Sequence, residues 1–261
     1  RYGFPPTSYT NNYGYFTRFL EVGGLKSGVG KTKFIEPVSA DQTMDEFTVE
    51  LDLEFLPMCN AELTKKLTGY DALMYQTIIG LLDEESKEEF TEQIVKYIDE
   101  DMEIVEMELK NTDAQDAGVK PLLVDATFTS DIFVQKAGNN YLINVGKMIG
   151  PQSEMYDDEE RVLPITHYTN KVYKRTLIVN IPEGYEVSNL EKLAMDISFD
   201  QNGDRDMGFV SSYTLEGSVL KITCEEYYYT MNYPIERYED FKKVINAAAD
   251  FNKIAILLKK K

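Results

Sequence analysis

The sequence predicts a β-rich α+β protein, in which an antiparallel sheet with two helices is followed by a β-sandwich-like domain with a C-terminal helix. Several segments alternate apolar and polar residues with period two, a few show helical periodicity, and glycine-containing turns separate them. The 261 residues, 43% of them hydrophobic, can bury a substantial core, and this length favours two domains. We expect an extended arm or linker over residues 1–44, an α+β domain over 45–150 and a β-sandwich-like domain over 151–261.

The expected arm is rich in Gly, Pro, Tyr and Asn and shows little periodicity. Its residues 26–32 (KSGVGKT) are similar to a phosphate-binding loop, whose backbone amides cradle phosphates. That motif requires Gly where Leu25 stands, and a helix after the lysine, which Pro37 would interrupt. We therefore expect a flexible glycine-rich loop and no nucleotide site.

The α+β domain begins with a strand. From residue 47 to 55, Phe, Val and Leu alternate with Thr, Glu and Asp, which predicts one buried face and one acidic face. Pro57 ends this strand, and apolar residues at positions 61, 63 and 67 indicate a partner strand.

Two helices are expected next. Residues 71–82 are strongly apolar, although Gly80 weakens the last turn. A second helix is expected from Ser86, because Glu89 gives the spacing of a capping box. Apolar residues at every fourth position from Phe90 to Met102 keep one face of this helix apolar.

Strands are expected again at residues 104–109 and 122–134, and a turn at 137–140 leads to a strand over 141–145. The polar, acidic segment 150–160 marks the predicted domain boundary.

In the last domain, apolar residues alternate around Leu177 to Ile181, and Asn202-Gly203 and Glu216-Gly217 are typical of hairpin turns. Pro234 suits the start of a helix, and residues 254–258 form the last predicted strand.

The charge distribution bears on partners. The net charge is -18, and residues 83–116 alone contain fourteen acidic and three basic side chains. Such a surface repels phosphate backbones and argues against nucleic acid as a partner; solubility is its plainest explanation. No apolar run approaches the roughly 20 residues that span a bilayer, so no membrane span is expected.

The informative segments of the C-terminal part are 150–152 (GPQ), 159–161 (EER) leading to Pro164, 181–185 (IPEGY), 212–217 (SYTLEG), 238–241 (YEDF) and 256–259 (ILLK). In order and spacing they resemble the C-terminal region of exported bacterial transglutaminase-like proteins, in which a module of unknown function follows a papain-like core. The resemblance is looser over residues 45–149, through 46–49 (EFTV) and 67–69 (LTG), and absent over 1–44.

The resemblance implies a periplasmic or extracellular protein whose partner is the upstream transglutaminase-like domain of the same polypeptide. Its catalysis needs a Cys nucleophile, a His base and an acidic residue close together. Only Cys59 with His167 could supply the first two, and they are expected in different domains. We predict no catalytic, cofactor-binding or metal-binding residues, and no cofactor.

Two other segments have alternative interpretations. Residues 200–206 (DQNGDRD) space oxygen side chains as calcium loops do, yet Arg205 and Ser211 stand where an EF-hand needs Gly and Glu; a tight hairpin is the plainer account. Tyr227, Tyr228 and Tyr229 form a cluster that either packs in a strand or forms a recognition surface.

The function expected first is a noncatalytic accessory region that docks on, or presents substrate to, the transglutaminase-like core. The alternative is an independent module that binds a cell-surface glycan or protein. An enzyme in its own right is the third hypothesis, and the sequence offers it no constellation of residues.

Overall fold

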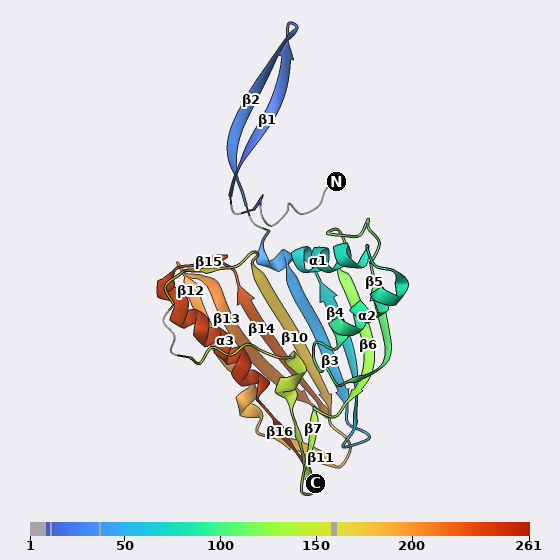
Figure 1. The fold of residues 1–261 in the computed structure, drawn as a ribbon. Helices are drawn as coiled ribbons and strands as arrows, with labels where there is room; N and C mark the ends of the chain where they lie inside the picture. Colours follow the sequence, from blue (N-terminus) through green and yellow to red (C-terminus); the bar gives the residue numbers. More distant parts are fainter. Residues whose placement is uncertain (1–8, 11, 37, 158–160) are drawn as a thin grey trace.

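The computed structural model describes residues 9–10, 12–36, 38–157 and 161–261. Its main feature is an eight-stranded mixed sheet with the strand order β12-β13-β14-β10-β3-β4-β6-β5 (Figure 1). The strands of this sheet are β3 (Met44–Asp52), β4 (Cys59–Leu67), β5 (Glu103–Lys110), β6 (Leu122–Ser130), β10 (Lys171–Asn180), β12 (Met195–Gln201), β13 (Asp204–Glu216) and β14 (Val219–Tyr228).

A four-stranded sheet, of order β11-β16-β8-β7, and two short two-residue strands accompany it. The predicted β-rich α+β class is confirmed. These strands are β7 (Val134–Ala137), β8 (Asn140–Ile143), β11 (Tyr185–Ser188), β16 (Ile256–Lys260), β9 (Ile165–Thr166) and β15 (Asn232–Tyr233).

Alternating burial confirms the predicted strand pattern. In β3, Phe47, Val49 and Leu51 are buried, and β4 buries every second residue from Cys59 onward. The hairpin at Asn202-Gly203 is also confirmed, because both residues have a positive φ, as a two-residue turn between right-twisted strands requires.

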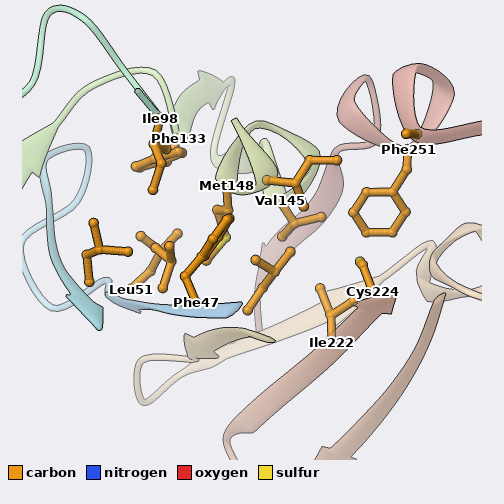
Figure 2. Close-up of a cluster of buried hydrophobic side chains, with 14 of the residues drawn as sticks. Phe47, Leu51, Ile98, Phe133, Val145, Met148, Ile222, Cys224 and Phe251 are labelled. Carbon is orange, nitrogen blue, oxygen red and sulfur yellow. The ribbon is translucent and has the colours of Figure 1, made fainter. Parts of the chain in front are cut away.

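The sheet is mixed because β10 pairs with β3 in parallel, whereas the sequence predicted an antiparallel sheet. This pairing joins strands from both sides of the expected boundary at residues 150–151, and β16 pairs with β8 across the same boundary. Both regions share one hydrophobic core. Figure 2 shows Leu51 of β3 in the same cluster as Ile222 of β14 and Phe251 of the last helix.

Three α-helices pack on the sheet in the described part of the chain. α2 is capped by Asp83, whose carboxylate accepts a hydrogen bond from the Ser86 amide at 2.9 Å. The predicted capping box at Ser86 is therefore wrong, since Asp83 and Ser86 are both good N-cap residues and the aspartate takes that position. The helices are α1 (Gly69–Ile79), α2 (Glu84–Val95) and α3 (Tyr238–Asn252), with 3-10 turns η2 (Ala40–Gln42), η3 (Val145–Ile149), η4 (Leu190–Leu193) and η5 (Ile235–Arg237).

A separate hairpin, β1 (Asn12–Val22) with β2 (Leu25–Ile35), extends away from the two larger sheets (Figure 1). The glycine-rich segment 26–32 lies within β2, so its prediction as a flexible loop is wrong. Its glycines accommodate aromatic rings of β1: a Cβ on Gly30 would overlap the Tyr15 ring, and one on Gly28 would lie 3.7 Å from the Phe19 ring. Pro37 and the pair Glu159-Glu160 lie outside the described residues.

Candidate functional site

Charged side chains occupy one end of the sheet face that the helices cover. Lys171, Tyr173 and Arg175 alternate along β10 and therefore share a face. Tyr173 lies directly opposite Glu226 on β14 and Asp45 on β3. The strand register thus brings cations and carboxylates together where a sheet normally buries apolar side chains.

Two ion pairs organise this polar end. Arg175 and Glu226, whose side chains are 5% and 7% exposed, are joined by an Nη1–Oε2 contact of 3.2 Å. The other Glu226 oxygen accepts a hydrogen bond from the Tyr228 hydroxyl at 2.9 Å. Lys65 lies 2.8 Å from Oδ2 of Asp45. Buried charges are costly unless they are paired in this way.

Among the described residues, the buried side-chain atoms without a hydrogen-bond partner include Nε of Arg175, Oδ1 of Asp45 and Nε2 of His167. Folded proteins leave few such atoms, because each one costs free energy. Lys171 and Asp71 also have no ion pair or hydrogen bond within the described part of the chain. Those three atoms are enclosed, whereas Lys171 and Asp71 are only half-buried and are therefore the charged groups here that stay open to another molecule.

These groups line two adjacent pockets that share Tyr97, Lys171 and Tyr173. We name the smaller one, of about 220 Å³, the arginine chamber, and the larger one, of about 430 Å³, the aspartate chamber. The arginine chamber is further lined by His167, Arg175, Glu226, Tyr228 and Phe241. The aspartate chamber is further lined by Asp45, Lys65, Asp71, Met74, Tyr75 and Phe90.

Burial changes the ionisation of groups in both chambers. It raises the pKa of Asp71, an effect that the nearby Lys171 ammonium partly offsets. It raises the pKa of the Tyr173 hydroxyl, with the Glu226 carboxylate adding to the shift. Burial, with a smaller contribution from Lys171, lowers the pKa of His167 and so favours the neutral imidazole. His167 packs among the rings of Tyr228, Tyr233 and Phe241.

A larger hollow of about 820 Å³ lies between α2 and β5. It is lined largely by Glu and Lys side chains, and none of the unpartnered buried atoms of the described residues belongs to it. We therefore regard the two chambers as the better candidate for a binding site.

Cys59 and His167 lie at opposite ends of the sheet. Cys59 begins β4 at one end of the sheet. His167 packs against Tyr228, which pairs with Lys171 at the other end. The nine residues of β4 separate these ends by about 25 Å. The Cys59 thiol donates a hydrogen bond to the Ser130 carbonyl at 3.1 Å, and burial raises its pKa to about 11.

The three tyrosines have different surroundings. Tyr227 and Tyr228 are 0% and 3% exposed, so a ligand on the surface would reach only Tyr229. Tyr227 stacks on Tyr229, with ring centroids 4.9 Å apart, and Arg205 lies over the Tyr227 ring at 4.1 Å. Tyr228 belongs to the arginine chamber.

The segment 200–206 forms the hairpin between β12 and β13. Asp206 is buried and lies 3.3 Å from Nη1 of Arg237, although the two are not aligned for a hydrogen bond. Within the described ranges, no group of three or more His, Cys, Asp or Glu side chains could hold a metal ion.

The hairpin β1–β2 is a second candidate surface. Tyr13, Tyr15 and Phe19 share one face of β1, beside Phe34 of β2. Phe19 and Leu25 are 81% and 77% exposed. Large clustered apolar side chains in solvent mark interaction surfaces.

Residues 139–258 match a family described as a domain of unknown function with solved structure, DUF3858. No curated protein and no solved structure matches the chain. The match supports the predicted C-terminal module of unknown function. It includes the arginine chamber residues Lys171, Arg175 and Glu226, whereas Asp45 and Asp71 precede it.

Sequence reasoning missed both chambers. The alternation along β10 could have predicted them. It places Lys171, Tyr173 and Arg175 on the same face as the buried Leu177 and Val179. The described helices include none long and apolar enough to cross a membrane.

Proposed function

We propose that the chain is a noncatalytic accessory region of a transglutaminase-like protein, which docks on, or presents substrate to, the upstream core of the same polypeptide. Its location would be periplasmic or extracellular. The observation that supports docking is the hairpin β1–β2, whose aromatic face is exposed.

This hairpin has a physical reason to bind a partner. A two-stranded sheet alone is marginally stable in water, and each large apolar side chain gains about 1.5–3 kcal/mol when it is fully buried. Tyr13 and Tyr15 are each 71% exposed beside Phe19. Burying these three against the core would stabilise both the hairpin and the complex.

The net positive charge of the hairpin indicates which kind of partner surface would bind it. Residues 12–35 contain Arg18, Lys26, Lys31 and Lys33 and the single carboxylate Glu21. An apolar patch with an acidic rim would complement this surface, and complementary charges accelerate association.

The noncatalytic part of the proposal is supported by Cys59 and His167. They lie at opposite ends of the sheet, and the raised pKa of Cys59 keeps it a thiol at neutral pH, whereas the nucleophile must be a thiolate. The alternative, a glycan- or protein-binding module, relied on the three tyrosines. Two of them are buried and offer a ligand no surface.

The test is calorimetric binding of this chain to the separately produced upstream portion. We expect micromolar or tighter association. Phe19→Asp should weaken it about tenfold or more, because a charge would replace a ring that becomes buried in the complex. The matched control is Phe55→Asp, since Phe55 is also exposed, at 65%, but lies outside the hairpin. The docking proposal is wrong if the wild-type chain does not bind, or if both variants weaken binding equally.

A further inference from the structure

The arginine chamber presents hydrogen-bond donors that lack acceptors. Nε of Arg175 is buried and unpartnered, and the Lys171 ammonium has no ion pair among the described residues. Among the described residues, the one carboxylate that lines this chamber belongs to Glu226, and both of its oxygens are engaged, by Arg175 and Tyr228. This chamber therefore lacks an anionic hydrogen-bond acceptor, which the carboxylate of a ligand would supply.

The aspartate chamber, in contrast, contains hydrogen-bond acceptors that lack donors. Oδ1 of Asp45 is buried without a partner, and Asp71 has no ion pair or hydrogen bond in the described ranges. Lys65, which also lines this chamber, is already held by Oδ2 of Asp45 at 2.8 Å. Lys171, which also lines this chamber, acts on Asp71 through its charge without forming an ion pair or hydrogen bond, so a ligand's ammonium group would supply the missing donors. Tyr75 and Phe90, with centroids 5.8 Å apart, give the same chamber an aromatic wall.

The spacing of the two ends suits one small molecule. Asp45 and Tyr173 are directly paired across β3 and β10, and Arg175 lies two residues further along β10. Strand geometry then separates the Cα atoms of Asp45 and Arg175 by about 8 Å. An extended dipeptide spans about 7 Å.

The charges also balance. The cations Lys65, Lys171 and Arg175 equal in number the carboxylates Asp45, Asp71 and Glu226 that line the two chambers. A polyanion such as a phosphate chain would find no net positive charge here. A neutral sugar would leave the charged donors and acceptors without charged partners.

We propose that the two chambers form one binding site for a zwitterionic short peptide. Its carboxylate binds Arg175 and Lys171, and its ammonium binds Asp45 and Asp71. The larger, aromatic aspartate chamber takes the N-terminal side chain, and the smaller arginine chamber takes a small C-terminal residue. The volumes of about 220 and 430 Å³ together lie within the range of small-molecule sites, about 300–1,000 Å³. This site is separate from the hairpin and does not depend on docking.

The first measurement is calorimetric titration of the full chain with the dipeptide phenylalanyl-alanine, its N-acetyl form and its C-terminal amide. We expect saturable binding of the free dipeptide, and a loss of about tenfold or more for each capped form, because each cap removes one charge pair. No saturation at millimolar dipeptide, or equal binding of the capped forms, overturns the proposal.

Variants assign each end of the ligand. Lys171→Met should weaken the free dipeptide about tenfold or more but leave the C-terminal amide unaffected, and Asp71→Asn should do the same for the N-acetyl form. Lys174→Met is the matched control, since Lys174 is exposed and points to the opposite face of β10. Thermal unfolding of each variant confirms that it is folded. If Lys171→Met and Lys174→Met bind the dipeptide alike, Lys171 is not a ligand-binding residue and the proposed orientation is wrong.

Discussion

The two ends of the eight-stranded sheet use the same strands and the same face, but they bury different chemistry. Toward one end, Leu51, Leu177 and Ile222 fill the core (Figure 2 shows Leu51 and Ile222). Toward the other end, the same alternation places Arg175 and Lys171 under the helices. The first end gains stability from burial, whereas the second keeps charged groups whose partners are incomplete. The incomplete partners at the polar end are the physical basis of the binding site proposed above.

The largest effect should come from breaking the buried ion pair. Arg175→Ala leaves Glu226 buried without its counter-charge, and we expect it to lower the free energy of unfolding by about 3–5 kcal/mol. The double variant Arg175→Met with Glu226→Leu should recover most of this loss, because apolar pairs of similar volume replace buried ion pairs well. Urea denaturation measures both. A double variant as unstable as Arg175→Ala would show that the polar end is needed for the fold.

Next comes truncation at the apolar end. Leu51 is fully buried, so Leu51→Ala should cost about 2–5 kcal/mol in the free energy of unfolding through lost burial and the cavity it leaves. Dipeptide binding by the folded variant should be unchanged, because Leu51 does not line either chamber. A parallel loss of binding would mean that the two ends of the sheet are coupled.

Much of the fold could be predicted because it is encoded locally. Alternation in β3 and the Asn202-Gly203 turn depend on neighbouring residues. The parallel pairing of β3 with β10 could not be predicted, because the two strands lie far apart in the sequence and neither carries a signal for its partner. The chambers were missed for a related reason: they form only when this pairing places Asp45 beside Tyr173.

In the hairpin β1–β2, by contrast, a local sequence pattern led to a wrong prediction. Residues 26–32 have the glycines of a loop, but those glycines lie in β2 beneath Tyr15 and Phe19 of β1. The rings that need the space are in the preceding strand, so the glycine pattern is explained only by the cross-strand register.

The smallest expected effect concerns Asp71, in the aspartate chamber. Burial raises the pKa of Asp71 above its ordinary value. At a pH between the pKa of this group in the unfolded state and its pKa in the folded state, the folded state therefore binds more protons than the unfolded state. Stability contributed by this group is therefore present at low pH and falls as the pH rises through the raised pKa.

Asp71→Asn removes the titration while keeping the shape of the side chain. Its stability relative to the wild type should rise between pH 4 and pH 7, measured by urea midpoints. Asp101→Asn, which removes one carboxylate at an exposed position, is the control for the loss of a single negative charge. If the two variants follow the same pH dependence, burial of the Asp71 charge does not distinguish the polar end of the sheet from the surface, and the comparison between the two ends loses its electrostatic basis.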